Sequence, residues 1–544
     1  MGLIMKTIFR NGKIYTMKNQ ETVNNPLQAM VVKDDYILDL GTEQYIMGKY
    51  LNNKCRVVDL REKTVIPGFN DAHLHIYQYA LSNSKIRLNA VTGIEDISRR
   101  IKNYIKDRNI VPGKWIEGSG WNDKDFTTPG LPEKEELDLI APENPLILKR
   151  ACYHVALVNT RALEICQIDK KTPDPAGGKI ERDNQGSPTG VLYDDAIDLV
   201  ENKIPQKNIK QTKELLQQGF EAAARTGLSS LQTDDFLNIK DPSIILQAYQ
   251  ELAEENKLPL RINLQLRVNQ AEEIIKFSRQ GIKTGRGNIF FKYGPIKIIA
   301  DGSLGACTAA LRQPYFNKST KGDLLLSQTD LNRLVSTAYK EDCQVAVHAI
   351  GDAAVEMAAN SFSRIKTINN PRPIIVHAQL GSPSIYQKMA RNKVIAAVQP
   401  IFLATDWPII EDRVGTDRSF HSYAWQSMQQ SGIKICGSSD APIEPFNPLY
   451  GIYAAVTRHD LAGNPQGGWH PAEQLSVYDA VKIFTVNPAY QSFEEGIKGT
   501  LEIGKLADFT VLSEDIFHLD REKIKDITIL GTYVGGKAVY KAKT

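Results

Sequence analysis

The middle of the chain carries eight short apolar segments, and each of them ends in polar residues. Stretches with helical spacing of apolar positions separate most of these segments, as at 210–226 and 331–340. A repeated strand-then-helix order of this kind predicts a (β/α)₈ TIM-type barrel, whose functional groups gather at the carboxyl ends of the strands. The predicted strands are Thr64–His75, Leu228–Asp234, Leu260–Val268, Phe290–Asp301, Cys343–His348, Pro373–His377, Val394–Gln399 and Ile433–Asp440.

Both ends of the chain alternate apolar and polar residues with a period of two, which is typical of β-strands. Residues 7–16 predict a hairpin around an Asn-Gly turn, and residues 29–41 predict a second one. Residues 507–512 and 527–540 show the same alternation near the C-terminus. We therefore expect a small β-sandwich built from both termini, residues 1–64 and 491–544, around a barrel at residues 65–490.

One connection of the predicted barrel is far too long for a loop. Roughly 150 residues separate the first predicted strand from the second, whereas ordinary connections have a few residues. The sequence therefore predicts an inserted subdomain at residues 85–205, placed over the barrel mouth after the first strand.

The composition of the chain argues against nucleic-acid and membrane partners. The 544 residues include 66 basic and 63 acidic side chains, for a formal net charge of +3. This balance argues against nucleic-acid binding, and the longest apolar stretches are too short and interrupted to span a membrane. The six cysteines form no C-x-x-C pair and the N-terminus lacks a signal-peptide pattern, which favours a cytoplasmic protein with a small-molecule substrate.

The polar residues at the predicted strand ends share a chemistry. The first segment ends in an H-x-H pair, His73 and His75, whose spacing places both rings on one face of a strand. His348, His377 and Asp440 end three later segments, and the chain has only nine histidines. Four imidazoles and a carboxylate at one barrel mouth suit a hydrolytic transition metal, and Zn²⁺ is the expected ion.

Each of these residues also has a simpler interpretation. A strand-end histidine is usually hydrogen-bonded in the core or at the rim, and Asp440 could cap the turn that follows it. Lys297, in the fourth segment, could form an ordinary salt bridge. All the groups lie at the same end of the same predicted barrel, and this shared position favours the metal site.

Several ordered motifs resemble the amidohydrolase superfamily, and within it the amidohydrolase-3 branch of N-substituted formamide deformylase-like metal-dependent hydrolases. The resemblance covers nearly the whole chain. The matching stretches are residues 67–75, 118–121, 150–154, 188–190, 296–305 continuing to 315, 348–352, 377–379, 439–442 and 499–508.

The resemblance implies roles for the strand-end residues. It implies that His73 and His75 bind the more buried metal ion and that His348 and His377 bind a second one. Asp440 is implied to bind the first ion and to act as the general acid and base.

For Lys297, the resemblance implies carboxylation and bridging of two ions. A desolvated amine near cations can lose its proton and add CO₂, and the resulting carbamate offers two anionic oxygens. The expected cofactor is therefore two Zn²⁺ ions, or one if Lys297 stays unmodified.

The expected reaction is hydrolysis of an amide, formamide or cyclic amide C–N bond by a metal-activated hydroxide. Asp440 would move the proton, and His154 is a candidate donor to the developing oxyanion. Asp71 and Asp352 could orient ligand histidines, with turn capping as the alternative. Candidate substrate contacts are Trp121, Arg150, Asp301, Tyr315, Arg458 and His459.

Other functions stay open at this point. The same scaffold serves deaminases and lactonases, although deaminases of this superfamily usually lack the lysine that Lys297 matches. A non-enzymatic regulatory or binding protein and a metal-free sugar- or phosphate-binding barrel are further alternatives. The substrate, the metal and the oligomeric state, for which a homodimer is one option, are not determined by the sequence.

Overall fold

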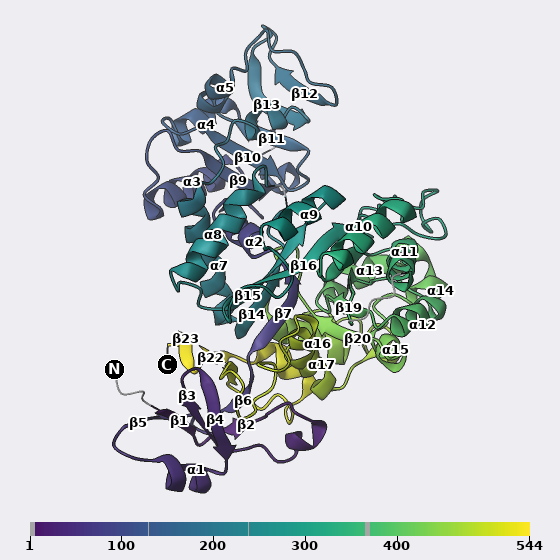
Figure 1. Cartoon of the computed structure of the whole chain (residues 1–544). Helices are drawn as coiled ribbons and strands as arrows, with labels where there is room; N and C mark the ends of the chain where they lie inside the picture. The colour runs from purple at the N-terminus through teal and green to yellow at the C-terminus, as the bar shows by residue number, and fades with distance from the viewer. Residues whose placement is uncertain (1–5, 129, 238, 365–369, 544) are drawn as a thin grey trace. The chain divides into compact units, whose positions relative to one another are not determined.

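The computed structural model describes residues 6–128, 130–237, 239–364 and 370–543. The chain forms two compact units (Figure 1). One unit combines Met1–Tyr79 with Thr212–Thr544, and the other is the continuous stretch Ala80–Gln211.

The larger unit contains a parallel eight-stranded sheet in the order β20-β19-β18-β17-β16-β15-β14-β7. Two backbone hydrogen bonds then connect the first strand to the loop after the last one. Asp440 N donates to His73 O over 2.9 Å, and His75 N donates to Ala441 O over 2.8 Å. The sheet is thus a nearly closed TIM-type barrel, as the sequence predicts. Its strands are β7 (Phe69–Leu74), β14 (Leu228–Thr233), β15 (Arg261–Arg267), β16 (Phe291–Ile299), β17 (Val345–Ala349), β18 (Ile374–His377), β19 (Ile395–Val398) and β20 (Lys434–Gly437).

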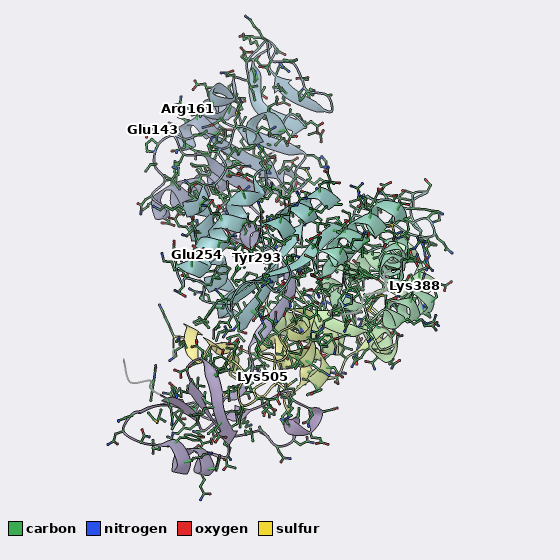
Figure 2. All side chains as sticks on the ribbon, in the orientation of Figure 1. Glu143, Arg161, Glu254, Tyr293, Lys388 and Lys505 are labelled. Atoms are coloured by element: carbon green, nitrogen blue, oxygen red, sulfur yellow. The ribbon has the colours of Figure 1, made fainter. Side chains whose placement is uncertain are left out.

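Amphipathic helices follow the barrel strands. Their apolar faces are buried, while charged residues such as Glu254, which is labelled in Figure 2, are exposed. The predicted helices at 210–226 and 331–340 are present as α7 and α10. The helices of this unit after β7 are α2 (Ile76–Asn83), α7 (Ile209–Arg225), α8 (Pro242–Glu254), α9 (Ala271–Arg279), α10 (Gln328–Lys340), α11 (Asp352–Ser363), α12 (Pro383–Arg391), α13 (Phe402–Val414), α14 (Thr416–Ser419), α15 (Trp425–Gln430), α16 (Pro448–Thr457), α17 (Val477–Ile483) and α18 (Val486–Gln491). Two of them, α2 and α7, extend across the boundary between the units.

The first predicted strand is divided in two. Residues 64–67 form β6 (Thr64–Pro67), which belongs to another sheet, and β7 begins at Phe69. The break falls at Gly68, where a Cβ atom would lie 2.3 Å from Ser229 Oγ. The close approach of β14 therefore requires glycine at this position. A single strand over 64–75 was the wrong prediction, because the apolar run continues through the change of sheet.

The chain ends form two smaller sheets. One has the order β4-β3-β1-β5, and the other, β2-β6-β21-β22-β23, combines N-terminal with C-terminal strands. Phe9, Phe509 and Tyr533 pack together from both sheets, with ring centroids 4.4–5.4 Å apart. The helix α1 (Glu43–Tyr50) contributes Ile46 to a separate cluster with Ile8. The strands are β1 (Lys6–Arg10), β2 (Lys13–Ile14), β3 (Ala29–Lys33), β4 (Tyr36–Gly41), β5 (Cys55–Asp59), β21 (Phe509–Leu512), β22 (Ile529–Val534) and β23 (Lys537–Lys541).

The Asn-Gly signal at residues 11–12 does not make a hairpin. β1 pairs with β3 and β5, whereas β2 pairs with β6 in the other sheet. Asn11 has φ of 54° and turns the chain from one sheet into the next. The predicted hairpin at 29–41 is confirmed, with β3 and β4 joined through Asp34 and Asp35 at positive φ.

The unit at Ala80–Gln211 has its own six-stranded sheet, in the order β12-β13-β11-β10-β9-β8, and its own apolar clusters. The sequence places an inserted subdomain at 85–205. The strands are β8 (Ile86–Arg87), β9 (Ile116–Trp121), β10 (Leu146–Arg150), β11 (Val155–Val158), β12 (Gly178–Arg182) and β13 (Pro188–Asp194), and the helices are α3 (Ile94–Asp107), α4 (Lys134–Ile140), α5 (Thr160–Cys166) and α6 (Asp198–Glu201).

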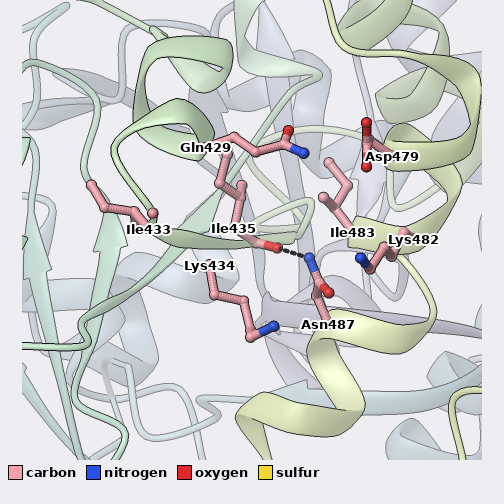
Figure 3. A pocket seen from close by; sticks show the side chains of 9 residues that line it. Gln429, Ile433, Lys434, Ile435, Asp479, Lys482, Ile483 and Asn487 are labelled. Atoms are coloured by element: carbon pink, nitrogen blue, oxygen red, sulfur yellow. Dashed lines mark hydrogen bonds between the residues drawn. The ribbon is translucent and has the colours of Figure 1, made fainter. Parts of the chain in front are cut away.

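A cavity of about 200 Å³ lies beside the amino end of β20 (Figure 3). Asn487 Nδ2 donates to Ile435 O over 2.7 Å at its wall, and Lys434 and Lys482 also line it. Asp440 follows the opposite end of β20, so this cavity contains none of the predicted metal ligands. Among the described helices, none combines the length and apolarity needed to cross a membrane.

A buried ion pair ties the barrel to the terminal sheets. Arg261, the first residue of β15, donates from Nη2 to Asp508 Oδ1 over 2.8 Å and also from Nε to the other carboxylate oxygen. Both side chains are at most 5% exposed. Asp508 precedes β21 and also accepts a hydrogen bond from Gly535 N.

The Asp508→Ala substitution should destabilise the larger unit by about 3–5 kcal/mol, because it leaves the Arg261 guanidinium buried without its counter-charge. Urea denaturation followed by circular dichroism measures the change. The double substitution Arg261→Met with Asp508→Leu removes both charges and should recover much of the loss. A single variant as stable as the wild type would show that the pair has no such role.

Candidate metal centre

The six predicted metal-binding residues lie in the carboxyl halves of barrel strands or in the loops directly after them. His73 is in β7 with His75 just after it, Lys297 is in β16, and His348 is in β17. His377 ends β18, and Asp440 comes three residues after β20. All but His348 are less than 9% exposed, so these polar groups are taken out of water together.

Asp440 is the centre of the first group of side chains. Its Oδ1 atom lies 3.3 Å from His73 Nε2 and 3.1 Å from His75 Nε2. Lys297 Nζ lies 3.2 Å from the same His73 nitrogen. Asp440 Oδ1 is nevertheless buried without a hydrogen-bond partner among the described residues. His73, His377 and Asp440 offer ligand atoms within 4.8 Å of one another, an arrangement that fits a metal ion.

The hydrogen bonds of His75 determine which of its ring nitrogens can bind a metal. His75 Nδ1 is bonded to the carbonyl oxygen of Asp234. A carbonyl oxygen only accepts, so Nδ1 carries the hydrogen and Nε2 carries the lone pair. This lone pair points to the Asp440 side, where the first ion would lie.

His348 and His377 form the second group. His377 Nε2 lies 2.9 Å from His348 Nδ1. The other nitrogen of each ring has an oxygen neighbour: His348 Nε2 lies 3.1 Å from Gly302 O, and His377 Nδ1 lies 2.8 Å from Gln399 Oε1. If those outer nitrogens donate, two lone pairs face each other across 2.9 Å. A shared cation makes such a contact favourable, so the donor set fits a second ion.

Electrostatics favours the neutral form of His73, His348 and His377, whereas at His75 the effect of burial is outweighed by Asp440 and Asp234, which raise the pKa of that ring. Burial, reinforced by the charge of Lys297, lowers the pKa of His73 to about 4 and that of His348 to about 3. Burial and the neighbouring His348 place the pKa of His377 well below its usual value. Neutral imidazoles are the form that binds metals.

The pKa values of Asp440 and Lys297 are also shifted in directions that suit a metal site. Burial opposes ionisation of Asp440, but the neighbouring His73 and His75 side chains hold the pKa of this carboxyl well below its usual range. Burial lowers the pKa of Lys297 to about 8, and Asp234 and Asp440 partly offset that effect. The site thus contains a firmly ionised carboxylate beside an amine that loses its proton more easily than an ordinary lysine.

The two aspartates predicted to orient ligand rings accept hydrogen bonds from backbone N–H groups and, at Asp71, from a serine hydroxyl instead. Asp71 accepts hydrogen bonds from His73 N, from Ser439 N and, over 2.6 Å, from Ser439 Oγ. Asp352 accepts from Arg312 N. The ring-orienting role was therefore the wrong interpretation for both. Asp71 instead joins β7 to the segment after β20.

Three candidate residues belong to the inserted unit. Trp121 is fully buried in its apolar core and donates from Nε1 to Leu148 O over 2.9 Å, so it is a packing residue there rather than a pocket-lining one. Arg150 pairs with Asp123 over 2.6 Å. His154 is 74% exposed and lies 2.8 Å from Asp194, and its role as an oxyanion donor stays a prediction.

Asp301 lies close to the histidines of the barrel. Its carboxylate accepts from the backbone N–H groups of Ala310, Ile350 and Gly351, and its Oδ1 is 3.5 Å from His348 Nε2. Asp301 therefore anchors the loops beside His348, and its role as a substrate contact stays a prediction.

The remaining substrate candidates have protein partners. Tyr315 donates to Ala309 O over 2.9 Å. Arg458 is fully buried, with its guanidinium 4.5 Å from the Trp425 ring centroid. His459 pairs with Glu522 over 3.3 Å. Substrate contacts by these residues stay predictions.

Sequence reasoning did not select Gln399 or the carbonyl groups of Asp234 and Gly302 as contributors to this site. A glutamine at the end of an apolar strand has no distinctive spacing, and backbone oxygens leave no signal in the residue types. For Gln399, the available signal was its position at the end of the seventh predicted strand, in line with the ligands on the other strands.

Comparisons with known proteins agree with this geometry. The model of a family described as the amidohydrolase family matches residues 56–540. A Bacillus subtilis (strain 168) protein named as an amidohydrolase, YtcJ, is 34% identical over 541 residues, which cover 99% of this chain and 100% of the relative. The N-substituted formamide deformylase of Arthrobacter pascens is 25% identical, with 95% of this chain and 96% of the relative covered.

A solved structure is also similar over nearly its whole length. An uncharacterised metal-dependent hydrolase from Pyrococcus furiosus superposes with a TM-score of 0.77 at 26% identity, covering 94% of this chain and 100% of that one. The family match spans most of the chain, and the buried histidines and carboxylate suit a divalent metal. The chain therefore belongs to the amidohydrolase family and is a metal-dependent hydrolase that acts on carbon–nitrogen bonds.

Proposed function

We propose that this enzyme hydrolyses the C–N bond of a small amide, formamide or cyclic amide, with Asp440 as the general acid and base. The observation that carries this proposal is the position of Asp440 Oδ1, buried, without a hydrogen-bond partner among the described residues and within 3.3 Å of both His73 Nε2 and His75 Nε2. The name of the Arthrobacter pascens relative, an N-substituted formamide deformylase, supports formamides within this group of substrates.

We propose that His73, His75 and Asp440 hold one divalent ion, and that His348 and His377 hold a second. A divalent cation, for which Zn²⁺ is our choice, lowers the pKa of a coordinated water toward neutrality and polarises the carbonyl under attack. The neutral imidazoles and the ionised carboxylate are the ligand forms that such ions require.

We propose further that Lys297 is carboxylated. The neutral amine attacks CO₂, the new N–C bond forms, and the nitrogen loses a proton to solvent, which leaves an anionic carbamate. Burial of Lys297 favours this step because it raises the share of neutral amine. The carbamate would replace a positive charge with a negative one and would supply two anionic oxygens as candidate metal ligands.

Asp440 is suited to move the proton during hydrolysis. Because its carboxyl stays ionised, it accepts the proton from the attacking water and passes it to the departing nitrogen. Burial of the surrounding side chains keeps bulk water from competing for this proton. The inserted unit, where His154 and Arg150 lie, is our candidate for setting specificity.

Asp440→Asn should lower kcat/KM by about 10²–10⁴-fold on the best substrate of a panel of formamides, N-acyl amines and cyclic amides, because amide side chains do not relay the proton. Amine release measures the rate. Asp515→Asn, in the loop after β21, serves as the matched control and should keep wild-type activity. Full activity of Asp440→Asn would rule out the proposed role.

Prolonged treatment with a chelator should abolish the hydrolysis, and added Zn²⁺ should restore it. Reloading should also raise the melting temperature, because ligand at about 100 times its Kd stabilises the folded state by about 2.7 kcal/mol. Activity that survives removal of all detectable metal would contradict the metal-dependent mechanism.

Lys297→Ala should lower the metal content from two ions per chain to one, as measured by inductively coupled plasma mass spectrometry. In the wild type, growth with ¹³C-bicarbonate should give a carbamate carbon signal that the variant lacks. Lys297→Arg is the comparison that keeps a positive charge and cannot form the carbamate. A wild-type protein with two ions and no carbamate signal would refute the carboxylation.

A further inference from the structure

Gln399 lies directly after β19 and contacts the ring of His377. It is 2% exposed, and its Oε1 atom is 2.8 Å from His377 Nδ1. Its nitrogen Nε2 donates to Ala397 O over 3.1 Å and to Ser438 Oγ over 2.8 Å. Every polar atom of this side chain therefore has a partner.

The orientation of the Gln399 amide is fixed without reference to the histidine. Ala397 O is a carbonyl and only accepts, and Ser438 uses its own hydroxyl hydrogen on Val398 O over 2.9 Å. Both groups therefore require the nitrogen of Gln399, which leaves Oε1 facing His377. Because a carbonyl oxygen cannot donate, His377 Nδ1 must carry the hydrogen of that contact.

The hydrogen on His377 Nδ1 determines the state of the other ring nitrogen, Nε2. A neutral imidazole with its hydrogen on Nδ1 has a lone pair on Nε2. His348 is constrained in the opposite sense, because its Nε2 faces Gly302 O and its lone pair is therefore on Nδ1. These two lone pairs face each other across 2.9 Å.

Without the Gln399 acceptor, the pair has a different option. His377 could place its hydrogen on Nε2 and donate it to His348 Nδ1 at the same 2.9 Å, which is an ordinary hydrogen-bond length. In that bond His377 Nε2 would carry a hydrogen and the lone pair of His348 Nδ1 would accept it, so neither nitrogen would be free to bind a cation. We propose that Gln399 is a positioning residue that fixes the tautomer of His377 and so keeps the His348–His377 pair open for a metal ion.

This inference rests on the proposed function, since it assumes that the pair binds a cation. Gln399→Leu removes the acceptor and should weaken binding of the second ion by about 10–100-fold, a usual cost when a hydrogen-bond partner of a metal-binding histidine is lost. The ion near Asp440 should be retained. Zinc titration against a competing chelator, on fully folded holoenzyme, measures both affinities without any substrate.

Two further variants separate tautomer control from packing. Gln379→Leu is the matched control, because Gln379 is about as buried as Gln399 and lies two residues after His377, but it donates to Asp406. It should keep the wild-type affinity for the second ion. Gln399→Glu keeps an acceptor for His377 Nδ1 and should lose less affinity than Gln399→Leu.

A spectroscopic measurement tests the wild type directly, whether or not the variants fold. Long-range ¹H–¹⁵N correlation on histidine-labelled, zinc-loaded protein should show the His377 hydrogen on Nδ1, assigned by its loss in His377→Asn. A hydrogen on Nε2 would overturn the inference. So would equal second-ion affinities for Gln399→Leu and the wild type. A wild-type protein that binds no metal would instead refute the proposed function.

Discussion

The contact that closes the barrel determines where the candidate metal ligands lie. Asp71 on β7 accepts hydrogen bonds from both Ser439 N and Ser439 Oγ, and the backbone of Asp440 donates to His73 O. Burial raises the pKa of Asp71 to about 7, although the Ser439 and His73 N–H contacts favour its carboxylate. The first strand and the last loop are therefore held together where His73 and Asp440 must meet. Without this contact, the two ligands would belong to independent ends of an open sheet.

The histidines of the candidate metal site are hydrogen-bonded mainly to neutral groups. The partners of the three rings with clear hydrogen bonds are uncharged oxygens: two backbone carbonyls, at Asp234 and Gly302, and the Gln399 amide. Nearby carboxylates are used elsewhere, since Asp234 pairs with Arg267 over 2.7 Å and Asp301 accepts backbone N–H groups. Neutral partners fix the tautomers without adding negative charge, so a cation bound there would keep more of its Lewis acidity.

The sequence predicted the barrel well because each strand is a short apolar run bounded by polar residues, and the packing of a buried parallel sheet imposes that pattern. The sequence-based prediction was wrong where a local pattern fits two different structures. The Asn-Gly pair at Asn11 and Gly12 turns the chain between two sheets, and the apolar run that begins at Thr64 changes sheets at Gly68. Asp71 and Gln399 act through contacts between residues far apart in the chain, which spacing alone does not reveal.

We propose that the nearly closed barrel holds two cations, one against Asp440 and one between His348 and His377. Anomalous X-ray diffraction from zinc-grown crystals, collected on both sides of the zinc absorption edge, locates such ions without any substrate. We expect two anomalous peaks per chain, one within bonding distance of His73 Nε2 and one within bonding distance of His377 Nε2. Crystals with full zinc in the medium and no peak at either position would contradict this proposal.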